Sequence, residues 1–248
     1  MELDVIILAG GKGSRMNADI PKPLRTVGGT PTLARILASV LPICGRPIIV
    51  AGDRASEIMH VGGKNCRYVF QKEQRGTGHA VACVKKSIEE NLLGENLMVL
   101  PGDHPLVEER TFIELSQSHL KSHASLTLGT LVVPDFKKDN LLFSHYGRIR
   151  RDSNGDIASI VEVKDASEQE RGIKEVNVGY YCFRTAWLWE NIDKLTNCNA
   201  SGEFYLTDLV GIAISQNART NVYTLKDIRQ GMGFNTPEQL EIIRRLCH

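Results

Sequence analysis

Hydrophobic positions in the first half of this 248-residue chain form short continuous runs, separated by segments in which they recur every three or four residues. Continuous runs of this length predict buried β-strands, and the spaced positions predict amphipathic helices. The predicted strands are Asp4–Leu8, Pro47–Ala51, Cys66–Phe70 and Asn96–Leu100, and the predicted helices are Thr32–Leu41, His79–Glu90 and Glu108–Lys121. Strands alternating with helices are typical of a parallel sheet covered by helices on both faces.

The second half of the chain is richer in predicted strands. These strands are Ser125–Val133, Gly147–Arg151, Ile157–Glu162 and Glu175–Phe183, and the predicted helices are Thr185–Ile192, Tyr205–Ser215 and Pro237–Arg245. The segment Ser153-Asn154-Gly155-Asp156 contains an Asn-Gly pair and predicts a hairpin turn. We see no internal repeat and no flexible linker, so the two halves are expected to be lobes of one α/β unit.

Composition narrows the class of protein without identifying it. The chain is 42% hydrophobic and 24% charged, with a formal net charge of +1. So small a net charge argues against nucleic acid as a main partner. The six cysteines are scattered and the amino-terminal segment is neither a signal peptide nor a membrane span, so we expect a cytoplasmic protein with no membrane partner. The oligomeric state stays open, a homo-oligomer included.

The first strand runs into a glycine-rich loop, Leu8-Ala9-Gly10-Gly11-Lys12-Gly13-Ser14-Arg15-Met16, which Pro21-Lys22-Pro23-Leu24 follows. Glycines allow backbone N–H groups to approach phosphate oxygens closely. Arg15 and Lys22 would add positive charge beside a triphosphate. The loop lacks the third glycine of a dinucleotide fingerprint, and the chain has no Gly-Lys-Ser or Gly-Lys-Thr of a P-loop. The alternative interpretation is a tight turn with cations on the surface.

Two further segments carry candidate chemistry. Asp103 ends the run Val99-Leu100-Pro101-Gly102-Asp103, where a carboxylate is either a Mg²⁺ ligand beside phosphates or the cap of a turn. In the segment from Gln71 to Ala80, the Gln71 amide can both donate to and accept from a pyrimidine edge. Gly76 and Thr77 supply backbone groups beside it, unless Thr77 or Gly78 only caps a helix.

The ordered set of motifs resembles the bacterial N-acetylglucosamine-1-phosphate uridylyltransferases. From Leu8 to Asn235 the matching segments are L-A-G-G-x-G-S-R-M, P-K-P-L, Q-x-E-Q-x-G-T-G-H-A, Y-G-R-I, I-V-E-V-K-D-A, E-V-N-V-G, N-A-S-G-E-F-Y-L-T-D and G-F-N. The resemblance implies a single nucleotidyltransferase domain with a Rossmann-like mixed, mainly parallel sheet flanked by helices, plus a strand-rich sugar-binding lobe. It divides the chain into a nucleotide-binding lobe (1–107), the sugar-binding lobe (108–235) and a C-terminal helix (236–248).

The same resemblance implies a role for each matching residue. The implied nucleotide-binding residues are Leu8, Ala9, Gly10, Gly11, Gly13, Ser14, Gln71, Gly76, Thr77 and Gly102. Arg15 and Lys22 are implied to be catalytic, and Asp103 and Asn235 to hold Mg²⁺. The implied sugar-binding residues are Gly147, Glu162, Asn177, Tyr205 and Thr207. Without the resemblance, Glu162 could be a solvated charge at a strand end and Asn177 a turn or bulge residue.

The implied partners are UTP and a sugar-1-phosphate, and the implied product is a UDP-sugar, with UDP-N-acetylglucosamine the first expectation. Gly10, Pro23 and Pro101 depart from the usual pattern and leave the sugar open. The alternatives are uridylyl or cytidylyl transfer to another hexose-1-phosphate, and a non-catalytic subunit that binds sugar nucleotides. The chain ends one predicted helix after the last motif, so the acetyl transfer of bifunctional relatives is not expected. His79 and His104 are assigned no catalytic role.

Overall fold

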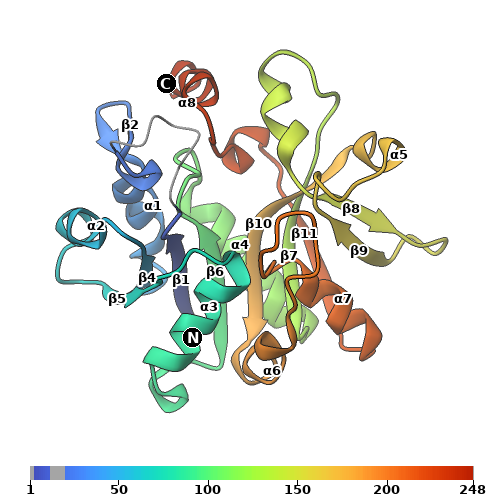
Figure 1. The fold of residues 1–248 in the computed structure, drawn as a ribbon, viewed down its shortest axis with the longest axis horizontal. Helices are drawn as coiled ribbons and strands as arrows, with labels where there is room; N and C mark the ends of the chain where they lie inside the picture. Colours follow the sequence, from blue (N-terminus) through green and yellow to red (C-terminus); the bar gives the residue numbers. More distant parts are fainter. Residues whose placement is uncertain (1–2, 12–19, 248) are drawn as a thin grey trace.

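The protein is described by a computed structural model that covers residues 3–11 and 20–247. The strands are β1 (Leu3–Ala9), β2 (Thr26–Val27), β3 (Thr30–Pro31), β4 (Ile48–Ala51), β5 (Arg67–Phe70), β6 (Asn96–Pro101), β7 (Leu126–Val132), β8 (Arg148–Arg151), β9 (Ile157–Val161), β10 (Glu175–Arg184) and β11 (Thr220–Thr224). Across the described residues, nine of them form one mixed sheet in the order β11-β7-β10-β6-β1-β4-β5, with β8 paired to β10 and β9 paired to β8 (Figure 1).

The helices cover this sheet from both sides. They are α1 (Thr32–Val40), α2 (Ala55–Gly62), α3 (Thr77–Ser87), α4 (Glu109–Ser122), α5 (Glu168–Arg171), α6 (Thr185–Asn191), α7 (Asp208–Ser215) and α8 (Pro237–Arg245). Short 3-10 helices lie at η1 (Lys22–Leu24), η2 (Glu90–Leu92), η3 (Lys138–His145), η4 (Ile192–Lys194) and η5 (Ile228–Gly231). None of the described helices is long and apolar enough to cross a membrane.

The strand pairing explains where a site can form. Strands β6, β1, β4 and β5 run parallel, so the loops after them emerge at one edge of the sheet. Strand β10 is antiparallel to both β6 and β7, and it carries the sheet into the second half of the chain. The predicted α/β fold with a mixed sheet flanked by helices is confirmed.

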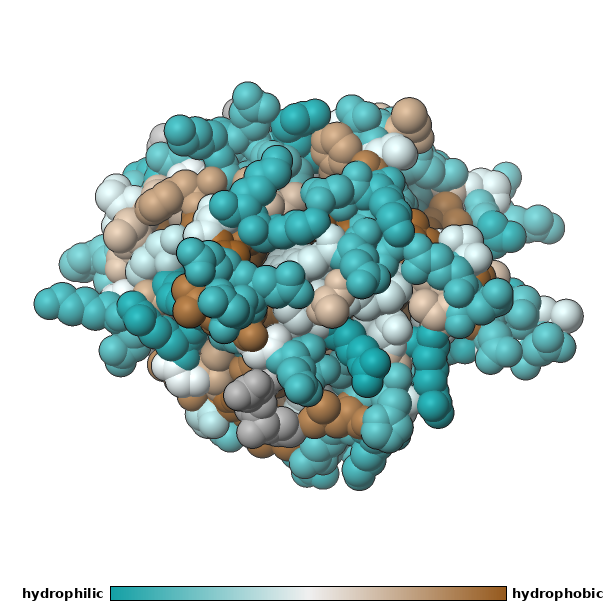
Figure 2. Space-filling view, turned by 90° about the horizontal axis from the view of Figure 1, so that it is seen from below, coloured by the Kyte–Doolittle hydropathy of each residue, from teal (hydrophilic) through white to brown (hydrophobic). Residues whose placement is uncertain are grey.

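Alternating side chains on β1 divide the core into two layers. Val5 and Ile7 pack with residues of α1, α2, α4 and α8, whereas Ile6 packs with residues of α3, α6 and α7. Successive strand residues point to opposite faces, so a strand that is covered on both sides is a nearly continuous run of hydrophobic residues, interrupted in β1 only by Asp4. Figure 2 shows a surface on which hydrophilic residues predominate and hydrophobic ones are scattered.

Element boundaries differ from the sequence prediction where local contacts override periodicity. Helix α3 begins at Thr77, two residues before the predicted start at His79, because Gly76 ends the preceding loop with a φ of +105°. Helix α7 begins only at Asp208, since residues 205–207 form a turn in which Asp208 N donates to Tyr205 O at 3.3 Å. The prediction missed β2, β3, β11, α2 and α5, whose residues show too little buried periodicity.

Strand β10 contains a bulge that the prediction did not include. Its register against β7 shifts between Asn177 and Tyr181, and Gly179 within it has a φ of +80°. Gly179 N donates to the Asn177 side-chain oxygen at 3.1 Å. A residue without a Cβ adopts this left-handed conformation without the steric cost that other residues bear. The bulge therefore depends on glycine at this position.

Gly179→Ala is expected to lower the free energy of unfolding by about 1–2 kcal/mol, the usual cost of a left-handed L-residue. The added methyl would meet only Pro101 side-chain atoms at 3.7 and 3.8 Å, so the loss would come from the backbone and not from a clash. Urea denaturation measures it.

Gly211→Ala is the matched control, because Gly211 lies within α7 and a methyl group added there would meet no atom within 4 Å. Alanine at such a helical site is expected to stabilise the protein by about 0.5–1 kcal/mol. Equal losses at the two positions would contradict the backbone explanation.

Candidate active site

A cavity of about 510 Å³ lies at the carboxyl edge of β1, β5 and β6. All expected nucleotide-binding residues that the structure describes line it: Leu8, Ala9, Gly10, Gly11, Gln71, Gly76, Thr77 and Gly102. Lys22, Asp103 and Asn235 line it as well. Three of the expected residues, Gly13, Ser14 and Arg15, lie outside the described residues. Segments that are far apart in the chain therefore line one cavity.

The loops after the strands approach one another backbone to backbone. Gly102 N donates to Leu8 O at 2.9 Å, and a Cβ on Gly102 would lie 2.6 Å from that oxygen. A Cβ on Gly52 would lie 2.4 Å from Gly10 O. These glycines are needed for packing whether or not a phosphate binds. Gly52 was not singled out from the sequence, although Gly52-Asp53 after β4 repeats the Gly-Asp pattern that follows β6.

A lysine, a carboxylate and an amide form the polar centre of the cavity. Lys22 Nζ donates to Asn235 Oδ1 at 2.5 Å, across 213 residues of chain, and lies 3.6 Å from Asp103 Oδ2. Prolines on both sides of Lys22 begin η1 and restrict its backbone. Asn235 is held just before α8, where its N–H donates to Gln239 Oε1 at 2.6 Å.

The donor set of this centre suits a hard divalent cation. Asp103 supplies a carboxylate and Asn235 an amide oxygen, which are ligand types that Mg²⁺ accepts. The Lys22 ammonium already lies against both side chains, so the space between them favours positive charge. Within residues 3–11 and 20–247, no three His, Cys, Asp or Glu side chains gather to hold an ion. An ion here would therefore need water or phosphate oxygens to complete its coordination.

The loop after β5 is held by hydrogen bonds to a distant segment. Gln71 Nε2 donates to Gly76 O at 3.1 Å, while Leu206 N donates to Thr77 Oγ1 at 3.0 Å. Gly78 N donates to Phe204 O at 2.8 Å. Neither Thr77 nor Gly78 caps α3, since the N-cap position is Gly76 and has no side-chain cap. The loop that carries Gln71 is therefore fixed by residues 204–206.

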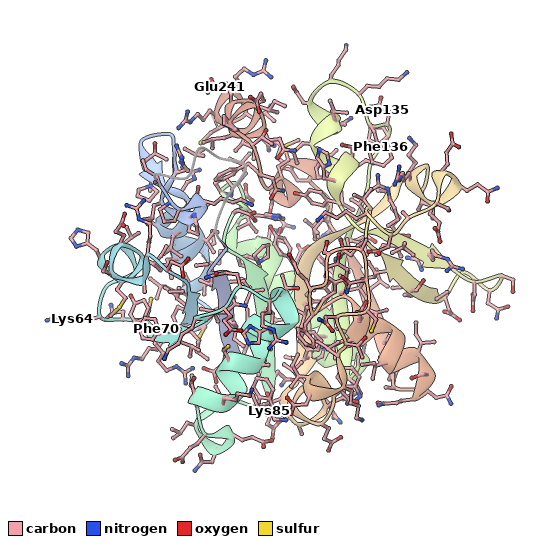
Figure 3. The ribbon with its side chains drawn as sticks, viewed as in Figure 1. Lys64, Phe70, Lys85, Asp135, Phe136 and Glu241 are labelled. Carbon is pink, nitrogen blue, oxygen red and sulfur yellow. The ribbon has the colours of Figure 1, made fainter. Side chains whose placement is uncertain are left out.

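A second set of hydrogen bonds joins the helix after this loop to the second half of the chain. Lys85 of α3, labelled in Figure 3, donates from Nζ to Asp193 Oδ2 and to Trp189 O, each at 2.5 Å. Both acceptors belong to the second half of the chain, in α6 and η4. The helix that follows the Gln71 loop is thus docked at both of its ends.

The expected sugar-binding residues form a separate polar cluster. Thr207 Oγ1 donates to Glu162 Oε1 at 3.2 Å, and a Cβ on Gly147 would lie 3.4 Å from the same oxygen. Asn177 N donates to Gly147 O at 2.9 Å. Tyr205 forms the turn that leads to Thr207. None of these five residues lines the 510 Å³ cavity, although Glu203 of the same loop does.

The environment of this cluster distinguishes Glu162 from a solvated charge. Burial raises the pKa of the Glu162 carboxyl, and the nearby carboxylates of Asp208 and Asp165 raise it further. The hydrogen bond from Thr207 opposes this shift. Asn177, in contrast, does lie at a bulge, and its side-chain oxygen accepts the Gly179 N–H.

His104 lies directly behind Asp103 and received no role from the sequence. The side chain is 5% exposed, and its Nδ1 lies 2.9 Å from the Tyr180 hydroxyl. Its Nε2 lies 3.6 Å from Asp103 Oδ1. Burial lowers the pKa of His104 to about 4, with Lys22 lowering it further and Asp103 opposing the shift. The only sequence signal was the histidine next to the Gly-Asp pair.

Comparison with known proteins agrees with this geometry. The chain is 39% identical over 237 residues to the bifunctional protein GlmU of Heliobacterium modesticaldum, covering 95% of this chain and 50% of that protein. It is 35% identical over 240 residues to GlmU of Desulfotalea psychrophila, covering 96% and 68%. It is 39% identical over 236 residues to GlmU of Limosilactobacillus fermentum, covering 94% and 49%.

The chain spans about half the length of two of these relatives. The similarity inferred from the motifs between Leu8 and Asn235 is thus confirmed over most of the chain. In addition, residues 5–153, more than half of the 248, match the family of MobA-like NTP transferase domains. With its sheet, its glycine loops and its cavity at the strand ends, this chain belongs to the MobA-like NTP transferase family.

Proposed function

We propose that this protein transfers a uridylyl group from UTP to N-acetylglucosamine-1-phosphate, forming UDP-N-acetylglucosamine and pyrophosphate. The observation that carries the proposal is the convergence of Lys22, Asp103 and Asn235 in a cavity lined by the expected nucleotide-binding residues. Similarity to GlmU proteins over about 95% of the chain supports the same substrates.

The proposed reaction needs positioning and charge rather than a base. An oxygen of the sugar phosphate attacks the α-phosphorus of UTP in line, the bond from that phosphorus to the β-phosphate bridging oxygen breaks, and pyrophosphate leaves. The attacking phosphate is already ionised near neutral pH, so no residue has to remove a proton. Catalysis then depends on orientation and on offsetting negative charge as it develops.

Different residues would orient the substrates and offset the negative charge. Lys22 would offset charge on the transferred phosphate, together with Arg15, which lies outside the described residues. Asp103 and Asn235 would hold Mg²⁺, which when bound offsets charge on the phosphate oxygens. Gln71, Gly76 and Thr77 would hold uracil, and Gly10 and Gly11 would approach the phosphates.

The second polar cluster would recognise the sugar. Glu162 and Thr207 offer a carboxylate and a hydroxyl beside Gly147, and Asn177 and Tyr205 flank them. In this assignment residues 1–107 bind the nucleotide, residues 108–235 bind the sugar, and residues 236–248 form the C-terminal helix.

Pyrophosphate release from UTP and N-acetylglucosamine-1-phosphate with Mg²⁺ tests the proposal directly. We expect the highest kcat/KM with this pair, compared with CTP and with glucose- or galactose-1-phosphate. A higher value for another pair would replace the substrates. Tight binding of UDP-sugar without turnover of any pair would instead indicate a non-catalytic subunit.

Asp103→Ala is expected to lower kcat/KM by about a hundredfold or more, because a charged group at the reacting phosphates is lost. Pyrophosphate release at saturating Mg²⁺ measures the effect. Asp193→Ala removes an exposed carboxylate that pairs with Lys85 and should leave turnover unchanged. Undiminished turnover of Asp103→Ala would exclude this carboxylate from the reaction.

Glu162→Gln is expected to raise KM for the sugar phosphate by about tenfold to a hundredfold, the usual worth of a hydrogen bond to a charged group. KM for UTP should change little, because the cluster around Glu162 is separate from the nucleotide cavity. Initial rates with each substrate varied in turn distinguish the two constants. Equal changes in both would argue against a sugar-binding role.

Lys22→Met is expected to lower turnover and to raise the affinity for a divalent ion. Turnover falls by about a hundredfold or more because positive charge at the phosphates is lost. The affinity of the substrate-free protein for Mn²⁺ rises, because the ammonium no longer lies between Asp103 and Asn235. Equilibrium dialysis measures the second effect, with Lys85→Met as the control on a half-buried lysine outside the cavity. A lower Mn²⁺ affinity would show that the ammonium does not occupy the place of a cation.

A further inference from the structure

The hydrogen bonds of His104 determine which ring nitrogen carries its proton. Nδ1 lies 2.9 Å from the Tyr180 hydroxyl, which lies 2.6 Å from the carbonyl oxygen of Gln230. A carbonyl oxygen only accepts, so the single hydroxyl proton of Tyr180 is directed at Gln230. The Tyr180 oxygen must then accept from Nδ1. In the neutral imidazole, this network assigns the proton to Nδ1 and leaves a lone pair on Nε2.

That lone pair faces a carboxylate oxygen. Nε2 lies 3.6 Å from Asp103 Oδ1, and the described residues donate no hydrogen bond to that oxygen. The Tyr146 hydroxyl lies 3.5 Å from Nε2, but it is 3.0 Å from Gly231 O and accepts from Gly233 N at 2.7 Å. Two electron-rich atoms therefore lie 3.6 Å apart beside the cavity, and a cation between them is favoured.

The separation of these two atoms fits one shared ion. Bonds from divalent ions to nitrogen or oxygen are about 2.0–2.2 Å long, so two donors within about 4.2 Å can contact one ion. Lys22 lies beside the other carboxylate oxygen, Oδ2, and beside Asn235 Oδ1. Nε2 thus adds a third protein donor on the Oδ1 side of Asp103, although His104 itself does not line the cavity.

The surroundings accommodate the imidazole closely. A Cβ on Gly233 would lie 2.4 Å from Nε2, so the ring fits only because residue 233, two positions before Asn235, is glycine. Histidines that bind metals usually donate their other ring N–H to an oxygen, which fixes the tautomer. Here the Tyr180 oxygen accepts the hydrogen bond from Nδ1, and the Tyr180 hydroxyl donates to the Gln230 carbonyl oxygen.

We propose that His104 Nε2 is a ligand of the divalent ion at Asp103 and Asn235, and that it biases the site toward ions that accept imidazole nitrogen. This rests on the proposed function only in placing an ion at those two residues. Imidazole suits late first-row ions, whereas carboxylate and carbonyl oxygens suit Mg²⁺. Co²⁺ should therefore bind more tightly, relative to Mg²⁺, than an all-oxygen site would allow.

Pulsed electron paramagnetic resonance of Mn²⁺ added to the full chain tests the ligand directly. The wild-type protein should show coupling of the ion to a ¹⁴N nucleus. His104→Asn should abolish it, because asparagine retains a donor near the Nδ1 position and lacks the Nε2 atom. His79→Asn is the matched control, because His79 contacts Gln71 beside the cavity and should not contribute nitrogen to the ion.

Metal titrations supply the second measurement. His104→Asn should lower the affinity for Co²⁺ by about tenfold or more and the affinity for Mg²⁺ by clearly less. Should His104→Asn fail to fold, Tyr180→Phe serves instead, because it keeps the imidazole and removes the oxygen that accepts from Nδ1. It should weaken Co²⁺ binding in the same direction.

Three results would overturn the proposal: no nitrogen coupling in the wild-type protein, coupling that survives in His104→Asn, or equal losses of Co²⁺ and Mg²⁺ affinity. These results are independent of catalysis. Nitrogen coupling without UDP-sugar formation would reject the proposed function alone, and UDP-sugar formation without coupling would reject the ligand alone.

Discussion

Strand β10 pairs with β6 on one side and with β7 on the other, and these two antiparallel ladders hold both halves of the chain in one sheet. The contacts around the cavity between the first and second halves of the chain depend on that pairing. It places Tyr180 behind His104, and it carries the bulge that presents Asn177 beside Gly147. Without β10 the parallel strands would keep their glycine loops but would lose the residues that face them.

The glycines at the strand ends can serve both loop packing and phosphate binding, and a sequence pattern does not distinguish these two roles. Gly10, Gly52 and Gly102 allow neighbouring loops to lie against each other, as the short distances from their missing side chains show. Gly10 and Gly102 also line the cavity in which we propose that the phosphates bind. A motif that identifies a nucleotide loop is therefore also a packing motif, and a substitution there would impair folding and binding together.

The sequence predicted the parallel strands and the residues of the cavity because both depend on local patterns. Continuous apolar runs identify β1, β4 and β6, and the loop motifs follow them directly. The position of α7 was wrong at its start because residues 205–207 are held by contacts with α3 and Glu162. Helix α2 has a single buried residue, Ile58, so it lacked the periodicity that prediction needs.

The network around His104 could not be predicted for a different reason. Its members come from four separate segments. Tyr146 and Gly233 belong to the Y-G-R-I and G-F-N motifs and Tyr180 and Gln230 to none, and no motif indicates that these residues contact His104. Only the fold brings them together. The pairing of Lys22 with Asn235 is similar, since the motifs named both residues but not their direct contact.

The hydrogen bonds between residues 77–78 and residues 204–206 connect two loops that the proposed function assigns to different substrates. They join the loop expected to hold the base to the loop that leads to Thr207 beside Glu162. Under the proposed function, a substrate that shifts one of these loops would shift the other as well, so the two substrates would be coupled in binding. Such coupling is reciprocal by thermodynamic necessity: each ligand would change the affinity of the other by the same factor.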